Sequence, residues 1–311
     1  WDAVFREDKN DLTAQKEYIE LLRGLFKSSA SKRFVKLAYI TGILPVKKYG
    51  TESALNNFYE FTMINPKNLS KYVGFTEDEV RELCKKYGMD YDEMKKWYDG
   101  YSFRRIKHIY NPNSVVQALL MQDYDSYWSK TETYESLKEY ISMNFDGLKD
   151  AVVRMLAGGR CKVNTDSFEN DMTCFKNRDD VLTALIHLGY LGYDRDKREA
   201  YIPNEEIRSA FSNAILKSDW SPVVRAIQSS ERLLEATWRM DCEAVAKGIS
   251  DVHKENTSIL AYNDENAMGC VIALAYYNAV NDYTLVREMP TGKGYADVVF
   301  LPRRGTDRPT L

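Results

Sequence analysis

The first third of the chain contains two different hydrophobic patterns. Between residues 11 and 27, apolar side chains recur at helical spacing: Tyr18, Leu21, Leu22, Leu25 and Phe26. The run at 34–44, "FVKLAYITGIL", is short and does not alternate with polar residues. Strands covered on both faces of a parallel sheet have this continuous pattern. We therefore expect a helix and then a buried strand of an α/β region whose other strands lie elsewhere.

Residues 76–98 have the pattern of two short helices. Thr76 followed by Glu79 matches a capping box at a helix start, and Gly88 separates the two apolar patterns. The chain then turns at the "DG" of "WYDGY" and crosses a basic loop, "RRIKH". After the "NP" pair we expect another helix, with Asn113 or Ser114 as its N-cap.

The remaining pattern is mostly helical until it changes near the end. Residues 125–235 have helical periodicity with one hairpin around "GYLGYDRDKREAYIPN". A long helix is expected at roughly 231–249 and another from near Asn263. The segments "YTLVREMP" and "YADVVFLP", separated by a loop with two glycines, have strand patterns. The last third therefore has the order α-α-β-β.

Composition indicates a folded chain with two or three domains. It has 311 residues, 44% of them hydrophobic. The net charge of -3 gives no global attraction to nucleic acid, although a local basic patch can still bind it. No apolar run is long enough to span a bilayer and no signal peptide pattern is present, so we expect a cytoplasmic protein without membrane contact.

The cysteine, histidine and tyrosine content limits the kinds of site that we expect in this chain. The five cysteines are scattered and never spaced as C-x-x-C, and the chain has three histidines, which argues against a disulfide framework or a zinc site. The 22 tyrosines are expected in cores and interfaces more than in base stacking.

One acid lies within a strand pattern. Asp297 belongs to "YADVVFL", a run of β-branched and aromatic residues bounded by glycines and a proline. A buried carboxylate is unfavourable without a cationic or metal partner. We therefore expect Asp297 to be partly desolvated and to have such a partner, or to lie at the exposed end of the strand.

A second acid is expected near Asp297. Glu265 lies three residues before Met268 and seven before Ile272, at the edge of the apolar stripe of its helix. Two carboxylates converging from a helix and a strand suit a divalent cation that activates water at a phosphoryl group. Two structural alternatives stay open. The helix dipole favours any acid in the first turn, which alone would explain Glu265. Asp297 can pair with Lys293 or Arg287 as an ordinary ion pair.

Several motifs together resemble one bacterial protein family. In order along the chain these are "YITGILPVKKYGTESALNNFYEFTMI", "KWYDGYSF", "IYNPNSVVQAL", "LTALIHLGYLGY", "YIPNEEIRSAF", "NDENAMGCVIALAYY" and "GKGYADVVFLPRR". They resemble proteins with an AAA-ATPase-like domain joined to a PD-(D/E)XK nuclease superfamily domain. The resemblance extends over the whole chain.

The resemblance implies a helix-rich α/β fold in three parts. These are the C-terminal part of a P-loop ATPase-like domain at 1–112, a helical linking region with a small hairpin at 113–230, and an incomplete nuclease-like α/β core at 231–311. Glu265 and Asp297 would be the catalytic and metal-binding acids for Mg²⁺ or Mn²⁺. Thr41 would correspond to the residue that senses the γ-phosphate of ATP, although it is equally consistent with an ordinary strand end.

Two family motifs are absent from this sequence. No G-x-x-x-x-G-K-[ST] phosphate loop occurs, and no E-x-K follows the Asp297 strand. We therefore interpret the chain as a piece of an ATP-binding, metal-dependent nuclease-like protein that acts on nucleic acid. By itself it is expected to be inactive and to bind no cofactor tightly. One alternative is a non-catalytic nucleic-acid or protein-binding module with a switch-like ATPase half, and another is a helical interaction protein.

Three weaker candidates complete the list. "RRIKH" at 104–108 can contact phosphates but is more typical of a solvated surface. The aromatic pair in "WYDGY" can stack a base, yet it is more typical of a helix anchor. The arginines after the last strand suit a surface that faces DNA, although isolated arginines in a terminal loop carry little weight.

Overall fold

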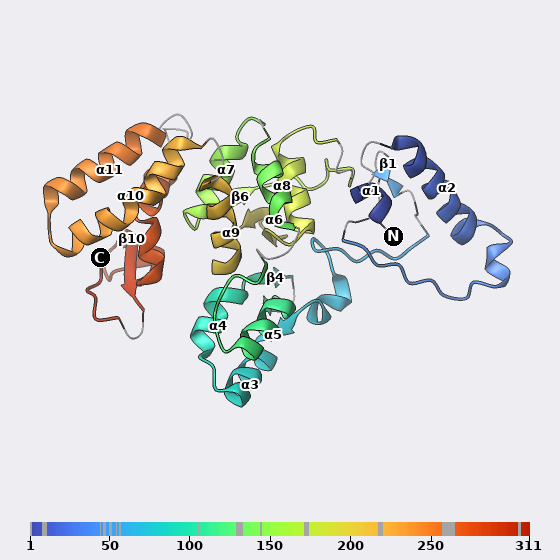
Figure 1. Ribbon diagram of the computed structural model, residues 1–311, viewed down its shortest axis with the longest axis horizontal. Helices are drawn as coiled ribbons and strands as arrows, with labels where there is room; N and C mark the ends of the chain where they lie inside the picture. The colour runs from blue at the N-terminus through green and yellow to red at the C-terminus, as the bar shows by residue number, and fades with distance from the viewer. Residues whose placement is uncertain are drawn as a thin grey trace. The chain divides into compact units, whose positions relative to one another are not determined.

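The computed structural model describes residues 2–311, except 8–10, 44, 46–47, 50–51, 54, 56, 105, 129–132, 144, 171–173, 217–219, 257–264 and 304–305. Over these residues the fold is α/β and rich in helix, as the sequence predicted (Figure 1). The strands form small sheets, and every strand pair whose register is described is antiparallel. No helix in the described part of the chain is both long and apolar enough to cross a membrane.

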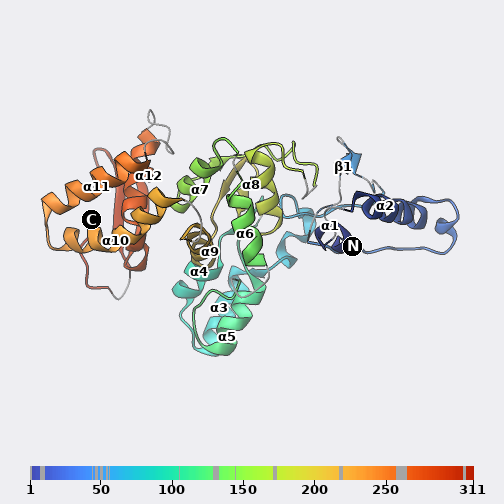
Figure 2. The same ribbon diagram turned by 45° about the horizontal axis from the view of Figure 1, so that its top comes forward.

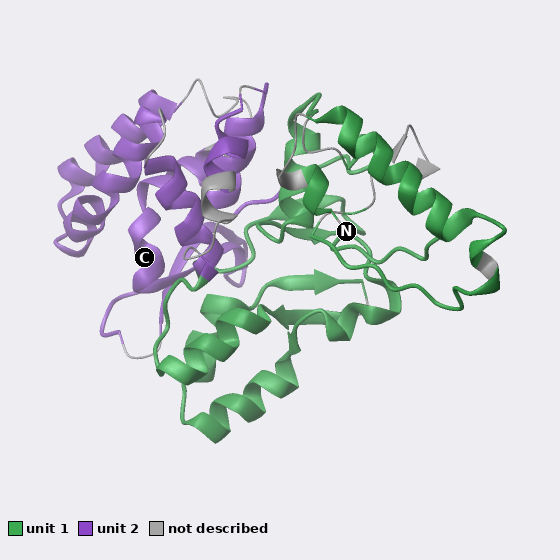
Figure 3. Cartoon of the chain, turned by 45° about the vertical axis from the view of Figure 1, so that its right-hand side comes forward, with its two compact units in different colours: residues 1–127, 162–205 green, residues 128–161, 206–311 purple. Residues whose placement is uncertain are grey.

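The chain divides into two compact units, each built from two separate stretches (Figure 3). Unit 1 comprises Trp1–Tyr127 and Lys162–Glu205, and unit 2 comprises Trp128–Cys161 and Glu206–Leu311. The ranges expected from the family resemblance, 1–112, 113–230 and 231–311, are continuous stretches of sequence and differ from these two units.

Unit 1 contains short helices and three small sheets. Its helices are α1 (Ala3–Glu7), α2 (Leu12–Lys27), α3 (Glu77–Tyr87), α4 (Tyr91–Tyr98), α5 (Pro112–Met121) and α8 (Arg178–His187). Its strands are β1 (Lys48–Tyr49), β2 (Glu52–Ser53), β3 (Phe75–Thr76), β4 (Tyr101–Phe103), β5 (Ile106–Tyr110), β7 (Gly192–Asp194) and β8 (Glu199–Tyr201), with β6 (Cys161–Lys162) at the unit boundary. One sheet has the order β3-β5-β4 and another β6-β8-β7.

The helix pair α3–α4 forms as predicted. Thr76 and Glu79 make the capping box, and Gly88 ends α3 in the left-handed conformation that glycine adopts most easily. Asp90 caps α4 by accepting a hydrogen bond from the Glu93 amide. These helices and α5 bury a common core, which fixes the position of the turn after α4: Val80, Cys84, Met94, Tyr98, Tyr110, Val115, Ala118 and Leu119.

The prediction of a buried strand at 34–44 is wrong over its described residues. Residues 34–43 have no strand structure, and Leu37 and Tyr39 are among the most exposed large hydrophobic side chains. Residue 44 lies outside the described residues. The preceding helix α2 forms as predicted, since Asp11 caps it and its own backbone hydrogen bonds define it. A strand needs a partner from elsewhere in the chain, and the described residues supply none here.

Two further details differ from the sequence predictions. The N-cap of α5 is Asn111, whose side chain accepts hydrogen bonds from Asn113 and Ser114, so neither of those two residues is the cap. The basic stretch is also no simple loop, because β4 and β5 form a hairpin through it. The predicted hairpin in the middle region is confirmed as β7–β8.

Unit 2 is mainly helical and ends in a β-hairpin. Its helices are α6 (Thr133–Ile141), α7 (Leu148–Leu156), α9 (Glu205–Leu216), α10 (Ser221–Trp238), α11 (Cys242–Asn256) and α12 (Glu265–Ala275). Helices α10, α11 and α12 lie together beside the terminal hairpin (Figure 2). The hairpin pairs β9 (Tyr283–Pro290) with β10 (Tyr295–Pro302), so the two strands predicted at the end of the sequence are confirmed.

The long helix predicted at 231–249 is two helices. The chain breaks between α10 and α11, where Met240 has a φ of 57°. Asp241 then caps α11 by accepting a hydrogen bond from the Ala244 amide at 3.0 Å. The apolar pattern runs through this break because both helices bury side chains in the same unit.

Candidate functional site

Of the three site residues predicted from the sequence, Thr41 belongs to unit 1, and Glu265 and Asp297 belong to unit 2. Thr41 is exposed, in the unit 1 segment that forms no strand. Glu265 begins α12 in unit 2, but its side chain lies outside the described residues. Asp297 lies in the exposed first half of β10, which agrees with the second of the two expectations and not with a partly desolvated carboxylate. Among the described residues Asp297 makes no ion pair with Lys293 or Arg287.

The hairpin register shows which way Asp297 lies. Val298 pairs with Arg287 across the hairpin, so these two side chains share a face. Arg287 reaches α12, where a Cβ added at Gly269 would lie 3.3 Å from its Nη1. Since side chains alternate along a strand, Asp297 lies on the opposite face from Arg287. The apolar flanks of Asp297 predicted a strand correctly but not which face of it is covered.

The site proposed for Mg²⁺ or Mn²⁺ combines the exposed carboxylate of Asp297 with Glu265, whose side chain lies outside the described residues. No group of three or more metal-binding side chains occurs in the described part of the chain. An exposed carboxylate on one face of a hairpin leaves most of the coordination shell to water. We therefore derive no metal-dependent step from this arrangement.

Unit 2 contains a pocket with marked positive charge. Its volume is about 320 Å³, within the lower range of small-ligand sites. The described residues that line it include three arginines, Arg208, Arg287 and Arg303, and no aspartate or glutamate. Aromatic rings supply most of the apolar wall: Tyr276, Tyr277, Tyr283 and Phe300. A pocket of this kind favours an anion that carries an apolar or aromatic group.

Arg287 is the best defined cation of the pocket. Its Nη2 donates to the carbonyl oxygen of Ala157 at 3.2 Å and lies 3.8 Å from Sγ of Cys270. Its Nε is buried and has no hydrogen-bond partner. Neither contact partner carries a negative charge, and Arg287 forms no ion pair over the described residues. An unsatisfied buried donor is costly, so this guanidinium is suited to an additional acceptor.

The other two arginines are held by uncharged groups and rings. Nε of Arg303 donates to the carbonyl oxygens of Val280 and Tyr283 at 3.0 and 3.1 Å. The guanidinium of Arg208 lies over the Tyr277 ring, 5.5 Å from its centroid. The Tyr277 hydroxyl is hydrogen-bonded to Ser212. These contacts position the pocket walls on α9, on β9 and on the segment after β10.

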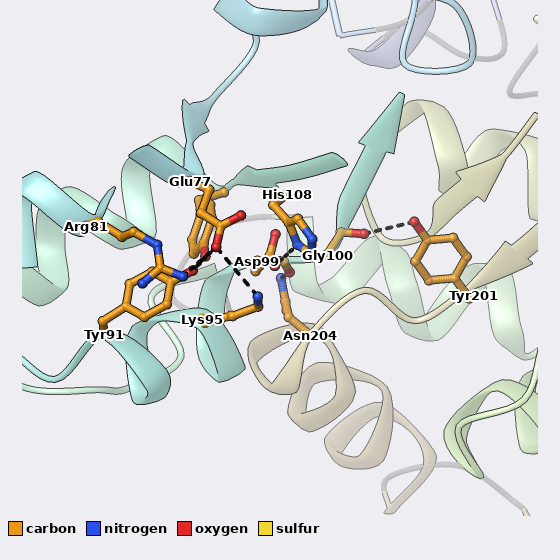
Figure 4. A network of polar contacts seen from close by, with 10 residues as sticks. Glu77, Arg81, Tyr91, Lys95, Asp99, Gly100, His108, Tyr201 and Asn204 are labelled. Carbon is orange, nitrogen blue, oxygen red and sulfur yellow. Dashed lines mark hydrogen bonds and ion pairs between the residues drawn. The ribbon is translucent and has the colours of Figure 1, made fainter. Parts of the chain in front are cut away.

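Unit 1 contains a different polar arrangement at the "DG" turn (Figure 4). Nδ1 of His108 on β5 lies 2.7 Å from Oδ2 of Asp99, which follows α4. The Asp99 side chain is 8% exposed and that of His108 is 42% exposed. Burial raises the pKa of Asp99, and the hydrogen bond from His108 opposes this shift. The second carboxylate oxygen, Oδ1, is buried and has no hydrogen-bond partner.

A β-bulge directs His108 toward Asp99. The pairs Tyr101–Ile109 and Phe103–Ile106 show an extra residue on β5 between them. His108 lies in this segment with a φ of 63°, a conformation that costs a non-glycine residue about 1 kcal/mol. Bulges and strained residues of this kind are frequent next to functional sites.

The backbone of the turn is held by residues of the 201–204 segment. The Tyr201 hydroxyl donates to the Gly100 carbonyl at 2.9 Å, and the Asn204 amide donates to the Asp99 carbonyl at 2.8 Å (Figure 4). Gly100 has a φ of 115°, and a Cβ there would lie 2.0 Å from the carbonyl oxygen of Pro203. Only glycine fits this position.

A second carboxylate in Figure 4, that of Glu77, has several partners at one oxygen. Oε1 of Glu77 accepts hydrogen bonds from Tyr91 and Arg81, both at 2.7 Å, and lies 3.9 Å from Nζ of Lys95. These donors, the Tyr91 hydroxyl first, lower the pKa of Glu77 to about 2. Glu77 is therefore ionised and held by local contacts, in contrast to Asp99, whose pKa is raised by burial.

Sequence reasoning assembled neither of these sites, although Arg303 of the pocket is one of the arginines noted after the last strand. The "DG" turn and "RRIKH" were each singled out, but nothing in the sequence shows that Asp99 and His108 meet. The pocket arginines lie in different elements with no shared motif. The one available signal was the small number of histidines, three in all, which made each of them worth weighing.

Comparisons with known proteins give little further guidance. No family profile matches the chain, and no solved structure matches it. A curated relative, an uncharacterized protein from the vnfD 5' region of Azotobacter chroococcum mcd 1, is 24% identical over 196 residues. The match covers 60% of this chain and 35% of the relative, so the chain corresponds to about a third of that protein's length.

Proposed function

We propose that unit 2 is a binding module for a phosphate-bearing ligand, with nucleic acid as the ligand class. The observation that carries the proposal is the arginine-lined pocket, in which Arg287 has a buried donor without a partner. Phosphate oxygens accept the charge-assisted hydrogen bonds that guanidinium groups offer. The tyrosine rings in the wall suit the stacking of a base next to the phosphate.

This proposal favours the binding-module alternative of the sequence analysis over catalysis. The resemblance to ATPase-nuclease proteins supports nucleic acid as the ligand class. Hydrolysis by Glu265 and Asp297 with Mg²⁺ or Mn²⁺, and coupling to ATP, stay predictions about a longer protein. The described residues support binding more directly than they support that chemistry.

The test is fluorescence anisotropy with a labelled single-stranded oligonucleotide and a labelled duplex, each titrated at several salt concentrations. Affinity should fall steeply with salt, because phosphate contacts release counterions. Arg287→Gln should weaken binding about tenfold or more, the effect of losing one charge-assisted hydrogen bond of about 1.5–3 kcal/mol.

Arg232→Gln is the matched control, because Arg232 is an exposed arginine of α10 outside the pocket. It removes the same charge from the same unit and should change the affinity less than twofold. Equal weakening by both substitutions would indicate non-specific attraction. Full affinity of Arg287→Gln, with the protein folded, would overturn the proposal.

A further inference from the structure

The Asp99–His108 pair in unit 1 has the arrangement of a reactive imidazole. A carboxylate that accepts from Nδ1 holds the ring in the tautomer that keeps the proton on Nδ1. The lone pair is then on Nε2. No hydrogen bond to Nε2 occurs over the described residues, and the ring is partly open to solvent. A nucleophilic nitrogen is thereby presented at the surface.

The surroundings of the ring favour an anionic reactant. Lys95 of α4 acts on Asp99 through its charge, and Lys107 is the exposed neighbour of His108. Arg104 at the hairpin tip lies 3.6 Å from Asp196. Asp196 therefore balances Arg104, and Lys95 lies 3.9 Å from Glu77, which Tyr91 and Arg81 also bind. The exposed Lys107 makes no ion pair among the described residues, and its charge favours an anionic reactant near the ring.

We propose that His108 is a phosphoryl-acceptor site, in which Nε2 takes a phosphoryl group from a small phosphorylated donor and Asp99 is the positioning residue. In this step the Nε2 lone pair forms a bond to phosphorus. The bond from phosphorus to the leaving group breaks, and the leaving group departs with that electron pair. The ring becomes an imidazolium with its proton on Nδ1, which the Asp99 carboxylate stabilises.

Three structural features support a functional role over a purely structural one. The bulge holds His108 in a strained conformation, the Asp99 carboxylate keeps one oxygen buried without a partner, and two side chains of the 201–204 segment fix the turn backbone. A structural ion pair requires none of these. Together they hold the ring orientation constant, which a nucleophile needs.

The chain supplies its own reference histidines for the test. His187 is buried and His253 is half-buried, and the His108 side chain is 42% exposed. The full chain is incubated with phosphoramidate, which donates a phosphoryl group and releases ammonia. Mass spectrometry gives the rate at each histidine, and ³¹P NMR distinguishes phosphorus on Nε2 from phosphorus on Nδ1.

We expect His108 to react at least tenfold faster than His253 in the native protein, with phosphorus on Nε2. In denaturant the rates should agree within about twofold. Asp99→Asn retains the side-chain shape and the ring exposure, so exposure alone predicts no change. We expect it to slow His108 at least fivefold while the rate at His253 stays the same.

A separate measurement applies if Asp99→Asn fails to fold. The ¹⁵N NMR spectrum of the wild-type protein should show His108 with its proton on Nδ1 at neutral pH. Phosphorus on Nδ1, a proton on Nε2, equal native rates at His108 and His253, or an unchanged His108 rate in a folded Asp99→Asn variant would each overturn the proposal.

Discussion

The two hairpins β4–β5 and β9–β10 each have an acid nearby, and the two acids lie in opposite environments. Asp99 follows the aromatic helix end Trp97–Tyr98 at a predicted turn, and it is buried against His108. Asp297 has apolar neighbours in the sequence, yet it is exposed, which was one of the two alternatives that the sequence left open. Burial of a carboxylate is therefore set by what packs over the hairpin.

Different segments pack against the two hairpins. At β4–β5, Tyr201, Pro203 and Asn204 approach the turn closely enough to exclude any side chain at Gly100. At β9–β10, α12 lies on the Arg287 face, and Asp297 is on the other face. The comparison predicts that matched substitutions will cost more in the first hairpin than in the second.

The largest difference is expected for Gly100→Ala against Gly292→Ala. Both glycines have positive φ, of 115° and 88°, but an added Cβ meets Pro203 at the first and open space at the second. We expect Gly100→Ala to cost about 3 kcal/mol or more in unfolding free energy and Gly292→Ala about 1 kcal/mol. Urea denaturation of both variants measures this, and equal costs would break the comparison.

A smaller difference is expected between two tyrosines. Tyr201→Phe removes the hydroxyl that donates to the Gly100 carbonyl and should lower the free energy of unfolding by about 1 kcal/mol. Tyr295→Phe is the control in β10, where the ring is 72% exposed, and should change stability by less than about 0.5 kcal/mol. Thermal melts of the two variants compare them; an unaffected Tyr201→Phe would show that this hydrogen bond contributes no net stability.

The pH dependence separates the two carboxylates of Figure 4. The pKa of Asp99 is raised in the folded state. Its contribution to the free energy of unfolding is therefore fully present below the unfolded pKa of about 3.9 and is lost as pH rises through the folded pKa. The pKa of Glu77 is lowered to about 2, so its contribution is present above its ordinary value and is lost as pH falls toward 2.

These signs give opposite expectations for two variants. Asp99→Asn should gain stability relative to the wild type as pH rises from about 4 to 7. Glu77→Gln should be less stable than the wild type near pH 4.5, and this difference should disappear as pH falls toward 2. Denaturant midpoints across this range measure both trends, and parallel curves for Asp99→Asn and the wild type would contradict a raised Asp99 pKa.

The smallest effect is expected for Asp297→Asn. Its carboxylate is exposed and makes no ion pair among the described residues, so the free energy of unfolding should change by less than about 0.5 kcal/mol at pH 7. An equilibrium denaturation curve with a shifted midpoint and unchanged slope would show that Asp297 has an energetic role that exposure does not reveal.

Locally determined features could be predicted from the sequence. The Thr76–Glu79 capping box involves residues three apart, and α2 forms its hydrogen bonds within itself. The final hairpin was predictable because its strands are close in sequence and joined by a glycine-containing turn. In each case the partners lie within a short stretch of chain.

The features that failed depend on distant partners. Whether residues 34–43 form a strand depends on a neighbouring strand, which the apolar run does not identify. The Asp99–His108 contact depends on a bulge. The Asp99–Gly100 turn depends on distant residues, since Tyr201 lies 101 positions after Gly100 and Asn204 lies 105 positions after Asp99. The pocket combines α9, α12 and β9, whose proximity no spacing rule gives.

The division of each unit into two stretches has a consequence for biosynthesis. Unit 1 needs Lys162–Glu205, which leave the ribosome after the first stretch of unit 2 has already emerged. Residues 128–161 must then wait for Glu206–Leu311 before they can pack with the rest of unit 2. Neither unit is a single continuous stretch, so we expect this chain to fold more slowly than a chain of sequential domains, with a longer period in which chaperones can bind it.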